Sequence, residues 1–205
     1  AANSIIIVDA ILDDMPIIYV NDAFAKMTGY SPLEVMGKNC RFLQKDDRKQ
    51  KEISELRNAI KNGKPCQVEL RNYKKDGTLF WNHLTITPIK NETGSVTHFI
   101  GVQNDITKRK KDEYLKEQSR KALEMIAKHQ SLSSIAKHIV AMVENQMANA
   151  MVSLLTLNEN TKTLHKLAAP NISKAFNDAI EGVKIGDNVG SCGTAAFLKE
   201  EIVVS

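Results

Sequence analysis

The chain has 205 residues, of which 42% are hydrophobic and 25% charged, and its formal net charge is +4. Such a composition is that of a globular protein with a real core, and the length suggests one large domain or one and a half ordinary ones. No run approaches the roughly 20 consecutive apolar residues that a membrane-spanning helix needs, so we expect no membrane partner.

The distribution of charged residues and cysteines argues against a nucleic-acid interface, a disulfide framework and a zinc site. The one dense basic run, Lys108 to Lys111, is followed at once by two acidic residues, which indicates a solvated helix start rather than a nucleic-acid interface. Cys40, Cys66 and Cys192 are too few and too scattered for a disulfide framework, and no CxxC spacing indicates zinc. Because the N-terminus also lacks the basic region of a signal peptide, we expect free thiols in a cytoplasmic protein.

Residues 1–106 contain short helices and strands separated by well-formed turns. Ser31 to Glu34 combine a capping box with proline at the first helical position, and two glycine-containing turns separate the last three strands. In chain order we predict strands near 5–10 and 17–20, a helix beginning at Ser31, a short helix within 37–44, a helix from about 48 to 61, and strands near 65–74, 79–90 and 95–105. The fold class is therefore α+β with five antiparallel strands.

The rest of the chain divides into a helical linker, 107–130, and a further segment, 131–205. The linker lacks glycine and proline and is rich in helix formers, and a weak coiled-coil seam runs along it through Leu115, Ser119, Ala122 and Ile126. Beyond it we predict a helix capped by Ser133 and Ser134 and ending at Met147, a strand over 151–157, a turn at 158–160 and another strand. The chain ends in an apolar strand-like run, 202–205, so we expect it to be part of something longer.

Strand periodicity places one amide side chain on the apolar face of each of the last three strands. The shared faces are Val68, Leu70 and Asn72; Phe80, Asn82, Leu84 and Ile86; and Phe99, Gly101 and Gln103. An unpaired buried amide costs about 1–3 kcal/mol, so the three amides either bond one another or bond a planar ligand that offers donors and acceptors. Three amides on one face favour the ligand, and Gly101 would let a flat ring approach the sheet closely.

A second half of the site is predicted in residues 37–44. In a short helix, Cys40 and Gln44 would lie on one face at i and i+4. Arg41 and Arg57 carry permanently charged guanidinium groups that could bind a terminal phosphate. An arginine on its own is more commonly solvated or paired with a carboxylate. The apolar wall would come from Leu43, Ile53, Leu56 and Ile60.

These residues carry a resemblance to a known family. The run Gly37-Lys38-Asn39-Cys40-Arg41-Phe42-Leu43-Gln44 resembles the GxNCRFLQ signature of LOV domains, the flavin-binding branch of the PAS fold. The agreement extends over about residues 4 to 107, through 72–77, 80–82 and 99–103. The resemblance implies a five-stranded antiparallel sheet with helices on one face and FMN as cofactor.

The resemblance also implies a role for each site residue. Asn39 and Gln44 would contact the ribityl chain, and Arg41 and Arg57 the phosphate. The pyrimidine edge would be bonded by Asn72 and Asn82, with Gln103 near the flavin N5 and O4, and the ring would pack against Ile6, Val8, Leu43, Leu70, Leu84, Ile86 and Phe99.

By the same resemblance, blue light would cause the Cys40 thiol to add reversibly to the flavin C4a carbon. The flavin N5 would change from acceptor to donor, and Gln103 would rotate its amide to match, which would alter the strand leading into the linker helix. Two residues depart from the family: Met15 stands where many members have asparagine, and Leu84 where plant members tend to have phenylalanine. We expect Met15 to loosen its loop at most, and Cys66 to be structural.

Residues 131–205 resemble the opening half of a GAF domain. The resemblance rests on 167–170 and above all on the run 186–196. We expect this segment to couple signals rather than to bind a ligand, with Cys192 a packing residue.

The opposite face of the predicted sheet carries Trp81, Thr85, His98, Ile100 and Val102 and is too apolar to face solvent. We expect a homodimer formed through this sheet face and the linker helix. An N-terminal cap helix outside this sequence is the alternative cover.

Three functions compete: a blue-light photoreceptor, a flavin-based redox sensor without a photocycle, and a flavin-dependent oxidoreductase. The enzyme is disfavoured because the sequence has no nicotinamide fingerprint and no paired acid and base. We therefore expect these residues to have no enzymatic activity and to signal to a downstream domain, such as a cyclic-dinucleotide enzyme or a histidine kinase.

Overall fold

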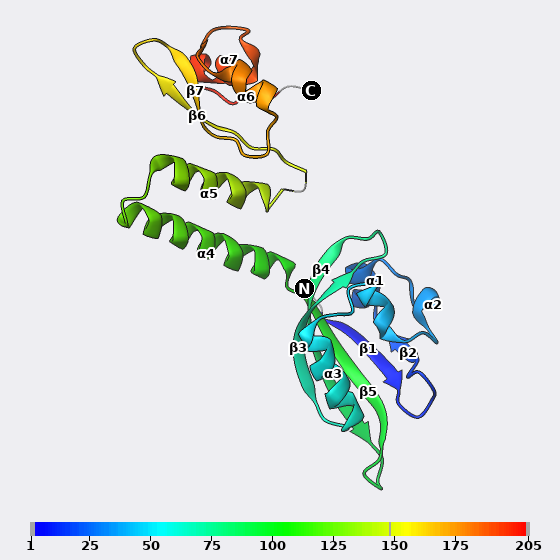
Figure 1. Cartoon of the computed structure of the whole chain (residues 1–205). Helices are drawn as coiled ribbons and strands as arrows, with labels where there is room; N and C mark the ends of the chain where they lie inside the picture. The colour runs from blue at the N-terminus through cyan, green and yellow to red at the C-terminus, as the bar shows by residue number, and fades with distance from the viewer. Residues whose placement is uncertain (1–2, 148, 204–205) are drawn as a thin grey trace. The chain divides into compact units, whose positions relative to one another are not determined.

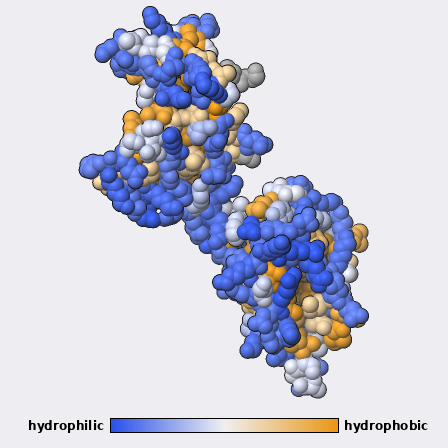
Figure 2. All heavy atoms as spheres, viewed as in Figure 1, coloured by the Kyte–Doolittle hydropathy of each residue, from blue (hydrophilic) through white to orange (hydrophobic). Residues whose placement is uncertain are grey.

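The computed structural model describes residues 3–147 and 149–203 and divides into two compact units, 1–110 and 111–205 (Figure 1). The predicted three-segment division at 106 and 130 stays a proposal. Among the described residues, no helix combines the length and the apolarity needed to cross a bilayer. On the surface visible in Figure 2, hydrophobic residues are scattered in small groups among hydrophilic ones.

A five-stranded antiparallel sheet forms the first unit, in the order β2-β1-β5-β4-β3. Its strands are β1 (Ser4–Asp9), β2 (Ile17–Val20), β3 (Cys66–Tyr73), β4 (Leu79–Lys90) and β5 (Val96–Asp105). Along β3, β4 and β5 buried residues alternate with half-buried or exposed ones, so one face of the sheet makes the core and the other does not. The predicted α+β class and the five antiparallel strands are confirmed.

Helical segments between β2 and β3 supply the rest of the core. They are α1 (Asp22–Thr28), α2 (Pro32–Val35), the 3₁₀ helix η1 (Cys40–Gln44) and α3 (Lys51–Lys61). Each contributes at least one buried side chain, such as Phe24 of α1 and Val35 of α2. The predicted capping box of α2 is present: the Ser31 backbone N–H donates to the Glu34 carboxylate at 2.9 Å.

The structure differs from the sequence prediction at one whole helix and one helix start in the first unit. Sequence analysis missed α1, although Asn21 caps its start by accepting a bond from the Phe24 amide and Gly29 closes it with φ of 77°. α3 begins at Lys51 rather than near residue 48, because the Gln50 side chain bonds the backbone N–H and C=O of Arg71. These two bonds hold the preceding residues against β3, outside the helix.

The second unit contains most of α4 (Thr107–Ala127), then α5 (Leu132–Glu144) and a three-stranded antiparallel sheet in the order β6-β7-β8. The remaining elements are β6 (Leu154–Asn158), β7 (Thr163–Ala168), α6 (Lys174–Ile180), β8 (Val183–Lys184) and α7 (Gly190–Leu198). Its small core packs Ala136 and Val140 of α5 against Ala168 of β7.

Several boundaries of the second unit differ from the prediction. Ser131, not Ser133 or Ser134, caps α5 by accepting a bond from the Ser134 amide, and α5 ends at Glu144 rather than Met147. β6 begins at Leu154 instead of 151. Residues 201–203 form no strand, and the rest of the predicted terminal run, 204–205, lies outside the described residues.

Candidate functional site

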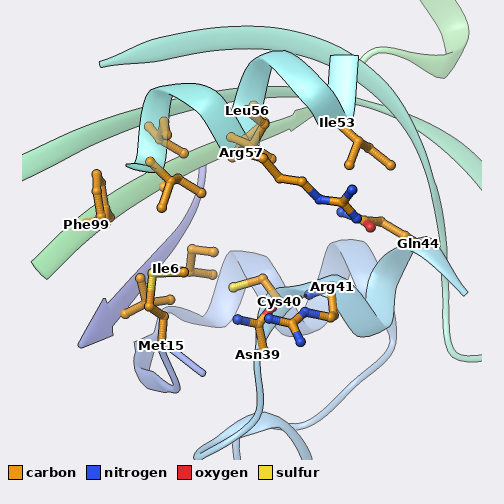
Figure 3. A pocket seen from close by; sticks show the side chains of 15 residues that line it. Ile6, Met15, Asn39, Cys40, Arg41, Gln44, Ile53, Leu56, Arg57 and Phe99 are labelled. Carbon is orange, nitrogen blue, oxygen red and sulfur yellow. Dashed lines mark hydrogen bonds between the residues drawn. The ribbon is translucent and has the colours of Figure 1, made fainter. Parts of the chain in front are cut away.

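The pocket lies between the sheet, η1 and α3 (Figure 3). Cys40, Asn39 and Arg41 enter it from one side, and Ile53, Leu56 and Arg57 of α3 lie across from them. The lining is mostly apolar, with polar groups confined to the η1 and α3 ends. The full set is Ile6, Val8, Met15, Asn39, Cys40, Arg41, Gln44, Ile53, Leu56, Arg57, Ile60, Leu84, Ile86, Phe99 and Gly101.

η1 positions the cysteine. Asn39 caps it by accepting a bond from the Arg41 amide at 3.0 Å. The sequence predicts that Cys40 and Gln44 share a helix face at i and i+4. The segment is a 3₁₀ helix, however, and its three residues per turn rotate the two side chains apart. Both side chains nevertheless line the pocket, Gln44 as a buried residue.

Burial in the pocket wall raises the pKa of the Cys40 thiol to about 12. The thiolate would lose its hydration there, and this outweighs the opposite influence of the neighbouring Arg41 charge. At neutral pH Cys40 is therefore a protonated thiol that carries its own proton into any reaction at this site.

An amide cluster lies on the same sheet face as the pocket. Its members on β4 and β5 are each two residues away from a pocket-lining residue of the same strand. Asn72, Asn82 and Gln103 are 3%, 1% and 2% exposed. The Asn82 Nδ2 group donates to Asn72 Oδ1 at 2.9 Å and to Gln103 Oε1 at 3.0 Å. The three amides thus bond one another, as one of the two predicted possibilities requires. Asn82 Oδ1, however, is buried without a hydrogen-bond partner. An unpaired buried acceptor is costly, so this oxygen suits a ligand donor.

Gly101 sits where the sheet meets the pocket. A Cβ atom there would lie 2.8 Å from Ile6 Cγ1 and 3.5 Å from Leu84 Cδ1. A side chain at this position would therefore displace Ile6, which forms part of the pocket wall, and would pack directly against Leu84.

The two arginines reach the pocket from different elements, Arg41 from η1 and Arg57 from α3. Both are solvent-exposed. Arg41 Nη2 is paired with Asp14 Oδ1 at 2.5 Å, and the Asn39 side-chain amide donates to the Asp14 carbonyl. Asp14 was not among the sequence-predicted site residues, because its approach to Arg41 joins positions 27 apart through an irregular loop.

Most of the site residues predicted from the sequence line the pocket, while five of them do not. Leu43 and Leu70 are buried in the adjacent core, and Asn72, Asn82 and Gln103 form the amide cluster. Met15, expected only to affect its loop, lines the pocket with φ of 46°, a left-handed conformation that asparagine tolerates better than methionine.

A second set of contacts ties β4 to the beginning of α4. The Ile106 amide donates to the Trp81 carbonyl at 2.8 Å, and the Trp81 amide donates to Thr107 Oγ1 at 2.9 Å. Lys110 Nζ lies 5.1 Å from the centre of the Trp81 ring and also pairs with Glu69. The start of α4 is therefore fixed to the strand that carries Asn82.

Comparisons with known proteins identify this arrangement. The PAS domain family matches residues 3–108. The chain belongs to the PAS domain family. Phototropin-2 of Oryza sativa subsp. japonica is 48% identical over 103 residues, covering 50% of this chain and 11% of that protein. A blue-light-activated histidine kinase of Brucella ovis is 45% identical over 96 residues, covering 47% of this chain and 20% of that protein.

The type of PAS domain follows from a solved structure. The LOV domain of a blue-light activated histidine kinase from Erythrobacter litoralis EL346 is 40% identical, with a TM-score of 0.50, and the match covers 52% of this chain and 98% of that one. The first unit of this PAS protein is a LOV domain, as its sequence resemblance predicts. The chain spans only 11% and 20% of the two curated relatives, and the GAF resemblance of 131–205 stays a prediction.

Proposed function

We propose that the LOV domain is a blue-light sensor that binds FMN and forms a reversible bond between the flavin and Cys40. The observation that carries the proposal is the Cys40 thiol, which faces a mostly apolar pocket on the same sheet face as an amide cluster with one unpaired acceptor. Relatives named for blue-light activation and a solved structure named for a flavin analogue in a LOV domain support the assignment.

The residues present fit a flavin. Apolar side chains from the sheet and α3 offer both walls of a slot for a flat ring, and a ring N–H would satisfy the buried Asn82 Oδ1. Arg41 and Arg57, two guanidinium groups at the same pocket, suit a terminal phosphate and so favour FMN over riboflavin. Asn39 and Gln44 line the same pocket, and their amides could bond the polar chain that joins ring and phosphate.

The bound flavin would supply light absorption and an electrophilic ring carbon. Cys40 supplies both sulfur and proton, because its raised pKa keeps the thiol neutral. Gln103 can donate or accept through its amide, and in this structure its Oε1 accepts from Asn82. A rotation of that amide would exchange its bonds within the cluster and alter β5, which runs directly into Asp105 and α4.

For the rest of the chain we propose a coupling role. The segment 131–205 would act as the beginning of a GAF module, following a helical linker over 107–130, and would pass the signal to a downstream output domain. The half-buried outer face of β4 and β5, which includes Trp81, Ile100 and Val102, together with the linker would form a homodimer interface. Leu123 and Ile126 on α4 are exposed, which supports a partner for that helix.

The test compares the wild-type chain with Cys40→Ala. Wild type reconstituted with FMN should be yellow, lose its blue absorption band under blue light and recover in darkness. Cys40→Ala should bind FMN equally well and stay unbleached, whereas Cys66→Ala, the matched control, should bleach as wild type does. Unchanged bleaching in Cys40→Ala would refute the cysteine assignment. Coloured wild type that never bleaches would favour the redox sensor, and NAD(P)H-driven turnover the oxidoreductase.

A further inference from the structure

The loop between β1 and β2 is fastened to the residues proposed to hold the cofactor. Asp14 Oδ1 pairs with Arg41 Nη2 at 2.5 Å, and the Asn39 side chain donates to the Asp14 carbonyl. Asp14 and Met15 have φ of 63° and 46°, a tight left-handed turn that carries the Met15 side chain into the pocket lining. The loop therefore contributes to the pocket lining, and it is bonded to Asn39 and Arg41, the two residues at the start of η1 that would contact the polar tail of the ligand.

We propose that Asp14 is a specificity-determining residue that competes with the cofactor phosphate for Arg41. The inference rests on the proposed function, since it requires a phosphate-bearing flavin. The Asp14 carboxylate and a phosphate are both anionic, and both would accept hydrogen bonds from the Arg41 guanidinium group. Binding of the phosphate therefore breaks the Asp14–Arg41 pair or places two anions side by side. Either outcome reduces the preference for FMN over riboflavin that the two arginines provide.

The exposure of the pair limits how strong this competition is. The Arg41 and Asp14 side chains are 51% and 60% exposed, so water and salt screen them. Because an exposed ion pair changes binding by only a few fold, removing the Asp14 charge should tighten FMN binding about fourfold at ~10 mM ionic strength and about twofold at ~0.15 M, where salt screens the charge more strongly. Riboflavin has no phosphate, so its affinity should not change.

The experiment titrates the cofactor-free chain with FMN and, separately, with riboflavin, and follows flavin fluorescence. Asp14→Asn keeps the size of the side chain and removes its charge. Asp13→Asn is the matched control, because Asp13 is exposed and adjacent, while Arg41 pairs with Asp14. We expect Asp14→Asn to bind FMN about fourfold more tightly at low salt with riboflavin unchanged, and Asp13→Asn to shift FMN affinity much less.

Three results would overturn the inference. Weaker FMN binding by Asp14→Asn would show that Asp14 orients Arg41 toward the phosphate instead. Equal shifts in the two variants would show a net-charge effect without competition for Arg41, and unchanged FMN affinity would show no competition at all. If neither flavin binds to any of the three chains, the proposed function itself fails, which is a distinguishable outcome.

Discussion

At the scale of single residues, the environment of Cys40 decides the chemistry open to the site. A reactive thiol normally owes its reactivity to a lowered pKa, which makes it a thiolate. Burial in the pocket wall does the opposite to Cys40 and raises its pKa to about 12. Attack by a pre-formed thiolate is therefore disfavoured, and a reaction in which the sulfur and its proton are both consumed suits the site.

The pH dependence of bleaching tests this protonation state. Because the Cys40 pKa is raised to about 12, the neutral thiol persists well above the ordinary thiol range near 8.5. We expect the amplitude of light-induced bleaching in the FMN-loaded chain to be constant between pH 6 and about pH 10, measured by absorbance after a saturating flash. A sigmoidal change centred near pH 8.5 would mean that the thiol titrates normally.

Residue-level predictions from the sequence succeeded where a regular period governs side-chain direction. The alternation of strands places Asn72, Asn82 and Gln103 on the buried face, and the structure joins them by hydrogen bonds. The role of Asp14 was not predicted, because Asp14 is brought near Arg41 by an irregular loop in which Asp14 and Met15 have positive φ angles. Neither the loop's path nor its contact has a periodic signature in the sequence.

At the scale of elements, the segment after η1 is held to β3 by a polar cluster. Arg71 donates two bonds to the Asp47 carboxylate, at 2.7 and 3.0 Å, and Tyr73 donates a third at 3.2 Å. The Arg71 hydrogen bonds are the main reason that the pKa of Asp47 is lowered. The cluster thus fixes the chain leading away from Cys40 relative to the strand that carries Asn72.

Asp47→Asn should lower the free energy of unfolding by about 1 kcal/mol at neutral pH, a modest value because both side chains are partly exposed to water. Since the Asp47 pKa is lower in the folded state, its contribution is present above the unfolded carboxyl pKa of about 3.9 and is lost as pH falls through the folded value. Urea unfolding at pH 7 and below pH 3 measures this difference.

The matched control for that variant is Asp46→Asn, which removes the same charge from an exposed neighbouring position. It should leave stability within about 0.5 kcal/mol of wild type, as ordinary surface changes do. A difference for Asp47→Asn that persists undiminished at acid pH would contradict the electrostatic explanation.

Element boundaries were the weakest part of the sequence prediction, for local physical reasons. α1 buries little beyond Phe24 and Thr28, so its apolar period is short, and only the Asn21 cap and Gly29 mark its ends. The start of α3 depends on Gln50 bonding a strand 21 residues away, which no local propensity encodes.

At the scale of the whole molecule, the chain separates into units that meet within α4. The first unit extends to Lys110, four residues past the predicted boundary at 106. The extra residues belong there because Thr107 and Lys110 both contact Trp81. A signal leaving β5 or β4 would therefore enter α4 through its first turn, which is anchored to the LOV domain.

Residues 1–110 alone should consequently fold and bind FMN with the affinity of the full chain, within about twofold. Residues 1–106 should bind FMN too, but should be less stable, because Trp81 would lose the Thr107 and Lys110 contacts. Thermal unfolding and FMN titration of the three chains measure both effects. Loss of FMN binding in 1–110 would show that the second unit contributes to the site.

The bond to Cys40 is tested most directly by the infrared difference spectrum of the FMN-loaded chain, dark against illuminated, in the S–H stretching region. We predict that illumination removes one S–H band in wild type and in Cys66→Ala, that the band returns in darkness, and that Cys40→Ala shows no such change. Full visible bleaching of wild type without any loss of an S–H band would contradict the proposed bond.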